Sequence, residues 1–508
     1  MSDANAFDET VTLADKYVRR SGRVFLSGTQ ALVRLPILQA LRDKERGLNT
    51  AGFVSGYRGS PLANYDTALW AAKKELDAAG VVFQPGLNEE LAATSVWGTQ
   101  QVALLPDAKV DGVFGIWYAK GPGVDRSMDA VKHANAAGTS SLGGVLAVFG
   151  DDHGAQSSTM LHQSEQMFEA AAIPVLNPSD VEEHVTFGLH GIELSRYAGC
   201  WVGLKATTEV VESSASIDAT DPPLPIRPDD FAMPLSGLGI RYPDTAVEQE
   251  RRMLSSKLEA IAAFARANPI DRQELAVGPA RLGIVTTGKA YNDVRQALAE
   301  LGIGPVEADA LGLRIYKLGM TWPVEADGVR RFANALEEVL VIEEKRAFVE
   351  PQILMALRSV ERAPRVVGKS DTLGHALLPS IGELTPLIVA SAIIARLRFV
   401  GADVDGLETP LAVMVDAAAP VLPVSLVRTP FFCSGCPHNS STKVPEGSRA
   451  LAGTGCHSMS MYIPDRNAAF LTQMGGEGVN WIGQYPFVEG KHVFVNLGDG
   501  TFSHSGLL

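Results

Sequence analysis

The order of apolar and polar positions in residues 20–212 predicts buried strands that alternate with amphipathic helices. Four short apolar runs with glycine in or beside them are expected to be strands: AGFVSGY, VDGVFGIW, GGVLAVFG and CWVGLKA. Between them, SPLANYDTALWAAKKELDAAG and NEELAATSVWGTQQVALLP carry apolar residues at helical spacing, with Asn88 as the N-cap of the second helix. This alternation is typical of βαβ units around a parallel sheet, so we expect a first α/β domain here.

The pattern changes further along the chain. The Pro-rich run at 213–242 is incompatible with a central strand or a helix interior, so residues 213–279 are expected to be a linker followed by one helix. Residues 280–400 predict a second α/β block, with RLGIVTTG and EVLVIEE as strands and AYNDVRQALAELG as a helix. A further Pro-containing stretch then leads into a third region at 430–508.

The third region ends on HVFVNLGDG, an apolar run that leads into a Gly-rich turn. A strand of a parallel sheet without a following helix leaves apolar faces and ladder hydrogen bonds unmatched. We therefore expect this last domain to be incomplete in the sequence.

Composition agrees with a multidomain α/β enzyme. A chain of 508 residues is too long to fold around one hydrophobic core and should form roughly three domains. The net charge of -14 argues against nucleic acid as a general partner, and no apolar stretch reaches the ~18–20 residues that span a bilayer. The polar, acidic start does not resemble a signal peptide, so a cytoplasmic location without membrane contact is expected.

Three of the four cysteines cluster in FFCSGCPHNSSTKVPEGSRALAGTGCHSM, with His438 and His457 beside them. Cys433, Cys436 and Cys456 suit an iron–sulfur cluster or zinc if a fourth ligand exists. The alternative is three small buried side chains near a Gly-rich loop. The fourth cysteine, Cys200, lies in a predicted strand, where core packing is expected.

The terminal Gly498-Asp499-Gly500 turn has a form in which a strand end delivers a carboxylate to a divalent cation. Its glycines would let the backbone approach a diphosphate closely. An ordinary Asp-Gly turn explains the same residues, so this motif is weak by itself.

Several polar groups of the first domain follow predicted strands. The GYRGSP loop, with Gly59 and Ser60, suits a bound small molecule, although a plain turn is equally ordinary. Glu89 and Glu90 open a helix, where the helix dipole favours carboxylates, and one of them could also bind an aminopyrimidine nitrogen. The YAKGPGVDR run offers Lys120 and Arg126 as an oxyanion or carboxylate contact, or is a solvated loop.

Further polar residues in this domain follow the strand GGVLAVFG. The run VFGDDHGAQSSTMLHQSEQ places them where open α/β sheets carry their site residues: Asp151, Asp152, His153, Ser157, Ser158 and His162. A serine nucleophile is excluded, because the sequence has no GxSxG elbow.

Taken in order, these strings resemble the indolepyruvate ferredoxin oxidoreductase family of thiamine diphosphate-dependent 2-oxoacid oxidoreductases. GYRGSP is similar to GYPGTP, NEELA to NEKVA, and VFGDDHGAQSSTMLHQSEQ to ADDPG-x-SS-x-x-EQ. CSGCPHN with GTGCHSM is similar to CPGCPHR with GCYTLG. Arg58 replaces a proline of the family loop and Ser60 a threonine, which puts the shape of that loop in doubt.

The resemblance implies a pyrimidine-binding domain at 20–212, a transketolase-C-like domain at 280–400 and the start of a diphosphate-binding domain at 430–508. Glu89 would activate the aminopyrimidine, and Asp499 would ligate Mg²⁺ between Gly498 and Gly500. The three cysteines would hold a [4Fe-4S] cluster with a fourth cysteine beyond Leu508. The chain is thus expected to be the first part of a longer fused polypeptide.

The implied activity is oxidative decarboxylation of an aryl 2-oxoacid, of the indolepyruvate or phenylpyruvate type, to an acyl-CoA. Its partners would be coenzyme A and ferredoxin or a similar electron acceptor, and a dimer is expected by analogy. The alternatives are a non-redox thiamine diphosphate-dependent decarboxylase or synthase, and a zinc-stabilised subunit without activity of its own.

Overall fold

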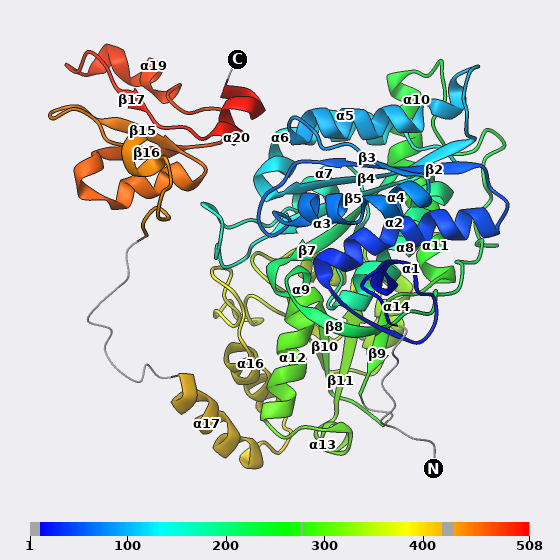
Figure 1. The fold of residues 1–508 in the computed structure, drawn as a ribbon. Helices are drawn as coiled ribbons and strands as arrows, with labels where there is room; N and C mark the ends of the chain where they lie inside the picture. The colour runs from blue at the N-terminus through cyan, green and yellow to red at the C-terminus, as the bar shows by residue number, and fades with distance from the viewer. Residues whose placement is uncertain (1–10, 276–277, 419–429, 507–508) are drawn as a thin grey trace. The chain divides into compact units, whose positions relative to one another are not determined.

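The computed structural model describes residues 11–275, 278–418 and 430–506, with the side chain of Asp499 also outside the description. These residues form two compact units, 1–418 and 419–508, and each is described here by itself (Figure 1). The acidic N-terminal residues 1–10 and residues 419–429 of the Pro-containing stretch lie outside the described residues.

A seven-stranded sheet forms the centre of the first unit. Its order is β12-β6-β7-β5-β4-β2-β3, and every strand is parallel to its neighbours except β12, which pairs antiparallel with β6. The strands are β2 (Thr50–Gly56), β3 (Val81–Phe83), β4 (Gly112–Lys120), β5 (Val145–Asp151), β6 (Val175–Leu176), β7 (Trp201–Thr207) and β12 (Met320–Trp322).

Helices cover both faces of this sheet because its central strands are buried on both sides (Figure 1). One face packs against α5 (Glu89–Gln100), α6 (Gly121–Ala137) and α7 (Glu165–Ala170). The other packs against α2 (Gly28–Glu45) and α8 (Val181–Ala198), with α3 (Tyr65–Ala71) and α4 (Lys73–Ala78) at its edge. The predicted α/β class with a parallel sheet is confirmed.

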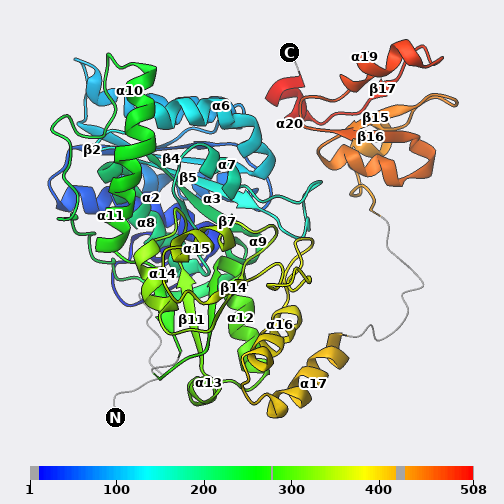
Figure 2. The same ribbon diagram turned by 180° about the vertical axis from the view of Figure 1, so that it is seen from behind.

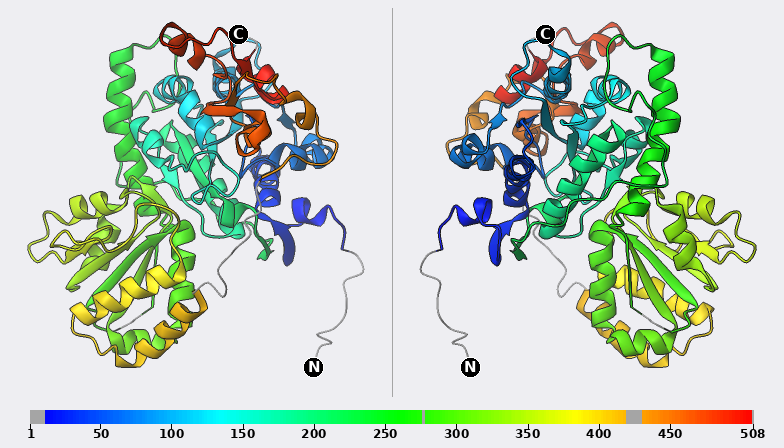
Figure 3. Two further views of the ribbon diagram at one scale, coloured as in Figure 1. Left: turned by 90° about the vertical axis from the view of Figure 1, so that its left-hand side faces the viewer. Right: turned by 90° about the vertical axis from the view of Figure 1, so that its right-hand side faces the viewer.

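A five-stranded sheet follows in the same unit, in the order β14-β13-β10-β11-β9. It consists of β9 (Arg272–Glu274), β10 (Leu282–Thr287), β11 (Leu313–Leu318), β13 (Glu338–Ile342) and β14 (Arg365–Val367), and only β9 is antiparallel. Helices α12 (Gly288–Glu300) and α16 (Pro386–Phe399) cover one face of this sheet, and α14 (Ala326–Ala333) and α15 (Glu350–Leu357) cover the other (Figures 2 and 3). Each pair of helices contributes side chains to its own apolar cluster. Smaller helices are α13 (Pro305–Leu311) and α17 (Glu408–Ala418).

The segment between the two sheets contains the one helix expected within residues 213–279. It runs through α10 (Ala246–Arg251), a π-helical turn at Arg252–Lys257 and α11 (Leu258–Ala267). The Pro-rich run is irregular apart from β8 (Ser214–Asp218), which pairs with β1 (Arg23–Ser27) in a separate two-stranded sheet behind α1 (Asp15–Val18). No helix in the described residues is long and apolar enough to cross a membrane.

The second unit is built on a small parallel sheet with the order β16-β15-β17. Its strands are β15 (Ala450–Gly453), β16 (Ala468–Thr472) and β17 (Phe494–Val495), and its helices are α18 (His438–Ser441), α19 (Asn480–Gln484) and α20 (Asp499–Thr501). The apolar run HVFVNL thus contains a strand of only two residues, and both are exposed. Short hydrogen-bonded turns occupy much of the rest.

Candidate functional site

Glu89 lies at the carboxyl edge of the seven-stranded sheet, as the first residue of α5. The Asn88 side chain accepts a 2.9 Å hydrogen bond from the amide of Leu91, which confirms the predicted N-cap. Although charged side chains seldom avoid solvent, Glu89 is only 2% exposed. A carboxylate held there at a helix N-terminus is favoured by the helix dipole.

The turn from β4 into α6 packs directly against Glu89. A Cβ on Gly123 would lie 2.5 Å from the Glu89 Oε1 atom and 2.5 Å from its Cγ, so only glycine leaves room for the carboxylate. Pro122 stands in the first turn of α6, where its missing N–H costs nothing. The Gly-Pro-Gly turn therefore shapes the wall of the Glu89 site.

Lys120, the last residue of β4, brings a cation to the same site. Burial lowers the pKa of its ammonium, and the nearby Glu89 carboxylate partly opposes that shift. Its aliphatic chain covers Gly59, where a Cβ would lie 2.4 Å from the Lys120 Cδ atom. Gly59 is thus explained by this contact, and its predicted role in cofactor binding stays a prediction.

His162 approaches the turn from the other side. A Cβ on Gly121 would lie 2.4 Å from the His162 ring, and the His162 Nε2 atom is 3.0 Å from Asp125 Oδ2. Burial is the largest influence on the pKa of His162 and lowers it, but the hydrogen bond to Asp125 and the charge of Asp125, together with smaller contributions from Met160 and Asp151, shift it upward overall. The Asp125 partner was missed from the sequence, because the two residues are 37 positions apart.

The GYRGSP loop lies over the ends of β4 and β5. The Tyr57 amide donates to the Tyr118 carbonyl at 3.2 Å, and the Ser60–Pro61 peptide bond is cis. Ser60 is half-buried and Arg58 is exposed in this loop. The loop therefore brings Gly59 and Ser60 to the edge that also carries Glu89.

Arg126 lies one turn further along α6, on its exposed side. The structure thus places Glu89, Gly59 and Ser60 at one edge of the sheet, with Arg126 on the helix that starts there. The roles assigned to these four residues from sequence stay predictions.

The polar run after β5 joins this edge to the second sheet. Asp151 accepts hydrogen bonds from the amide and hydroxyl of Ser164, at 2.9 and 2.5 Å. Gln163 exchanges hydrogen bonds of 3.0 and 3.2 Å with the backbone of Arg346, and the Lys345 ammonium donates to the His153 carbonyl. The loop that carries His162 is therefore held from both of its ends.

The cysteines of the second unit do not form a metal cage in the structure. Cys433 and Cys456 are exposed and Cys436 is half-buried. Cys433 and Cys436 share a turn closed by a 3.0 Å hydrogen bond between their backbones. Within the described residues, no group of three His, Cys, Asp or Glu side chains is placed to hold a metal ion. Cys200, in contrast, is fully buried in the first core, as predicted.

The Gly498 turn contacts a buried His–Glu pair that the sequence did not reveal. A Cβ on Gly498 would lie 3.6 Å from His457 Nδ1, and His457 Nε2 lies 3.7 Å from Glu477 Oε1. Glu477 also accepts hydrogen bonds from the Gly475 amide at 2.7 Å and the Thr501 hydroxyl at 3.2 Å. Asp499 begins α20, and its predicted metal-binding carboxylate lies outside the described side chains.

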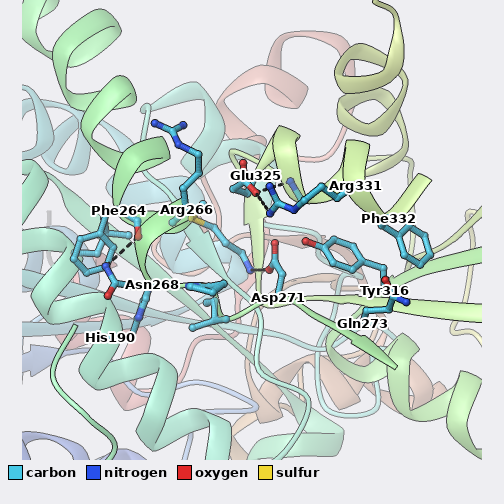
Figure 4. Close-up of a pocket in the computed structure, with 16 residues that line it drawn as sticks. His190, Phe264, Arg266, Asn268, Asp271, Gln273, Tyr316, Glu325, Arg331 and Phe332 are labelled. Carbon is cyan, nitrogen blue, oxygen red and sulfur yellow. Dashed lines mark hydrogen bonds and ion pairs between the residues drawn. The ribbon is translucent and has the colours of Figure 1, made fainter. Parts of the chain in front are cut away.

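A separate cavity of about 230 Å³ lies between α8, α11, β11 and α14 (Figure 4). Its charged groups have partners within the protein: Arg331 faces Glu325 at 3.5 Å, and Arg266 pairs with Asp230 at 2.7 Å. Asp271 accepts amide hydrogen bonds from Gly319 and Met320. We therefore do not assign this cavity to the candidate active site.

Comparison with a solved structure defines the class of fold. The 2-oxoglutarate:ferredoxin oxidoreductase from Magnetococcus marinus, solved with 2-oxoglutarate, coenzyme A and succinyl-CoA bound, matches with a TM-score of 0.51 and 16% identity. The match covers 74% of this chain and 66% of that chain. The chain therefore shares the α/β fold of that structure over the matched residues.

Sequence comparison finds relatives in one family. Residues 273–420 match the indolepyruvate oxidoreductase domain. The indolepyruvate oxidoreductase subunit IorA of Methanothermobacter marburgensis is 27% identical over 505 residues, which covers 96% of this chain and 72% of the relative. The same subunit of Pyrococcus horikoshii is 27% identical over 511 residues, covering 96% and 71%. The resemblance to the indolepyruvate oxidoreductase family is confirmed.

Proposed function

We propose that this chain provides the thiamine diphosphate site of a 2-oxoacid oxidoreductase. The observation that carries the proposal is Glu89, a carboxylate that is 2% exposed and packed against a turn that only glycine permits. A buried carboxylate beside a Cβ-free turn fits the flat edge of an aminopyrimidine ring. Thiamine diphosphate, when bound, supplies the nucleophilic carbon and the electron sink for oxidising a 2-oxoacid.

In this proposal Glu89 holds a proton between its carboxylate and the pyrimidine ring nitrogen. Two features orient Glu89. The Asn88 cap fixes the first turn of α5, and the Trp117 indole donates a 2.9 Å hydrogen bond to the Glu89 carbonyl. Because the carboxylate is enclosed, water competes weakly for this hydrogen bond. Asn88 and Trp117 are thus positioning residues.

Lys120 fits the carboxylate of the 2-oxoacid. Its ammonium is mostly enclosed at the same edge as Glu89, where an anionic substrate offers an opposite charge in a region of low polarity. Ser60, and Arg126 on α6, complete the set of polar groups that we assign to substrate binding. The substrate in this proposal is an aryl 2-oxoacid of the indolepyruvate or phenylpyruvate type, and the product an acyl-CoA.

We propose domain roles that follow the family resemblance. Residues 20–212 would bind the pyrimidine, 280–400 would form the transketolase-C-like domain, and 430–508 would begin the diphosphate-binding domain. Asp499 would ligate Mg²⁺, with Gly498 and Gly500 at the diphosphate. The proposed setting is a cytoplasmic dimer that passes electrons to ferredoxin or a similar acceptor.

The three cysteines are proposed as ligands of a [4Fe-4S] cluster, supported by their spacing alone. The described side chains are not gathered as such a cluster requires, so no step of the reaction is derived through it. Iron and zinc analysis of anaerobically purified protein separates the possibilities. About four irons per chain supports the cluster, while zinc at one equivalent without thiamine diphosphate binding supports a non-catalytic subunit.

The decisive experiment replaces Glu89 with glutamine in the complete protein. We expect Glu89→Gln to reduce 2-oxoacid-dependent reduction of a viologen dye by at least about 100-fold, in the range of general acid–base catalysis. The neighbouring Glu90→Gln is the matched control, because Glu90 shares the helix start but is only half-buried. Turnover retained by the Glu89 variant would overturn the proposal.

A further inference from the structure

A second cavity, of about 500 Å³, lies at the amino-terminal ends of the strands of the seven-stranded sheet, opposite the carboxyl ends where Glu89 lies. It is bounded by Ala103 and Leu104, by the Ser140-Ser141 turn that precedes β5, by Arg196 and Tyr197 at the end of α8, and by Arg227, Met233 and residues 236–241. The nine residues of β4 run from Gly112 at this edge to Lys120 at the other, about 26 Å away at strand spacing. A ligand in this cavity is therefore remote from Glu89.

The charged lining of this cavity is entirely cationic. Arg196, Arg227 and Arg241 line it, together with three serines, and no described carboxylate does, although the chain carries a net charge of -14. An arginine cluster on an acidic protein is the local setting in which an anion binds. The cavity volume also lies within the usual range of about 300–1000 Å³ for small-molecule sites.

The three guanidinium groups differ in what they already bind. Arg196 is neutralised by Asp43, with nitrogen–oxygen distances of 2.6 and 2.8 Å. It therefore lines the cavity without offering a free charge to a ligand. Arg241 donates to the Gly237 carbonyl at 2.8 Å, and carbonyls do not neutralise its charge. Arg227 is exposed and makes no hydrogen bond or ion pair with the described residues. Two cationic groups are therefore available.

Two carboxylates near the cavity offset these charges only in part, because each pairs with an arginine outside the cavity lining. Asp244 pairs with Arg252, and Asp230 pairs with Arg266 at 2.7 Å. The positive field is felt by Lys257, whose pKa falls to about 8, mainly through burial and further through Arg252 and Arg241.

Tyr197 supplies a second sign that a ligand belongs in the cavity. Its hydroxyl is buried and has no hydrogen-bond partner among the described residues. Leaving a buried hydroxyl unpaired is unfavourable, and an acceptor in the cavity would satisfy it. The apolar side chains Leu104, Met233, Leu238 and Ile240 line the same space, so the complementary ligand has an apolar part as well as an anionic one.

We propose that this cavity binds the phosphate group of a small phosphorylated organic molecule, at a regulatory site separate from the candidate active site. The forked guanidinium groups of Arg227 and Arg241 match phosphate oxygens geometrically. A free nucleotide and the phosphorylated end of coenzyme A share this chemistry. The proposal does not depend on the proposed function, because it uses none of the residues at the other edge.

Isothermal titration of the complete protein with ADP, coenzyme A and inorganic phosphate, at constant ionic strength, tests the proposal. We expect Arg227→Ala to weaken binding by about 10- to 100-fold, as loss of a hydrogen bond to a charged group predicts. Tyr197→Phe should weaken it less. The matched control is Arg251→Ala, which removes an exposed arginine of α10 that pairs with Glu248 outside the cavity.

The outcomes separate the two sources. Binding of ADP that Arg227→Ala weakens supports a free nucleotide, and binding of coenzyme A alone with the same loss supports its phosphorylated end. Arg227 is exposed and has no hydrogen bond or ion pair with the described residues to lose, so a folding defect should not obscure the result. Absence of binding for all three probes, or equal binding by wild type and Arg227→Ala, would overturn the proposal.

Discussion

The indole nitrogen of Trp117 donates a 2.9 Å hydrogen bond to the backbone carbonyl of Glu89. Trp117 is fully buried in the middle of the sheet, whereas Glu89 begins a helix that packs on one of its faces. The contact therefore ties the position of the candidate catalytic carboxylate to the core of the first unit. Changes to that core should reach the site through this residue.

Trp117→Phe should lower the free energy of unfolding by about 1–3 kcal/mol, because it removes a buried hydrogen bond and leaves a small void. It should also reduce 2-oxoacid oxidation more than stability alone explains. Urea denaturation and dye-reduction assays measure the two effects. Trp70→Phe, at a half-exposed position, is the control and should change neither. Full activity in Trp117→Phe would contradict the positioning role.

Gly123→Ala should displace the Glu89 side chain, since the added Cβ would lie 2.5 Å from it. We expect turnover to fall at least about 10-fold, as small misplacements of catalytic groups do. Gly98→Ala is the matched control, because nothing lies within 4 Å of its Cβ and alanine favours a helix by about 1 kcal/mol. Comparing kcat with the unfolding midpoint separates the two effects, and unchanged kcat in Gly123→Ala would count against the assigned geometry.

Lys205→Met should destabilise the first unit by about 3–5 kcal/mol, because it leaves buried carboxylates without their cation. The Lys205 ammonium is 2.5 Å from Glu165 and 3.6 Å from Asp151, and all three are buried. Lys73→Met removes an exposed pair with Asp77 and should cost less than about 0.5 kcal/mol. Equal shifts of the urea midpoint in the two variants would refute the expected contrast.

Asp271 should make stability depend on pH. Burial raises the pKa of its carboxyl from 3.8 to about 6, so the native state holds this proton more tightly than the unfolded chain. The resulting stabilisation amounts to at most about 3 kcal/mol of unfolding free energy. It is fully present below about pH 4 and is lost as the pH rises through 6. Between pH 4 and 7, the free energy of unfolding should fall more steeply with rising pH in the wild type than in Asp271→Asn.

The control for this titration is Asp129→Asn, whose carboxylate is largely exposed. Urea denaturation at intervals from pH 4 to 7 gives the slopes. If Asp271→Asn retains the wild-type slope, the assignment of this pH dependence to Asp271 is wrong.

Much of the first sheet could be predicted because its central strands β4, β5 and β7 are buried on both faces. VDGVFGIW, GGVLAVFG and CWVGLKA correspond to β4, β5 and β7 within three residues at each end. The predicted helix in SPLANYDTALWAAKKELDAAG is instead two, α3 and α4, which meet at Ala72. Periodicity alone does not reveal such a break.

Other elements could not be predicted because short or locally ambiguous segments carry little signal. The Pro-containing stretch begins with α17, where Pro410 stands in the first turn and is tolerated by the helix. At the candidate site, the sequence indicated Glu89 and Ser60 by their place after strands. The contacts of Gly59 with Lys120, and of His162 with Asp125, depend on tertiary packing and leave no local pattern.

The three-residue strand β12 gives the first unit an unusual mechanical property. It belongs in sequence to the second sheet, yet it forms the edge of the first by pairing with β6. Limited proteolysis in the segment between the two sheets would therefore not by itself release an intact first sheet. Separation must also remove β12 from β6, which exposes the backbone of β6 to pairing with another molecule. The unit should consequently melt cooperatively, in one transition, although each of its two sheets has its own hydrophobic clusters.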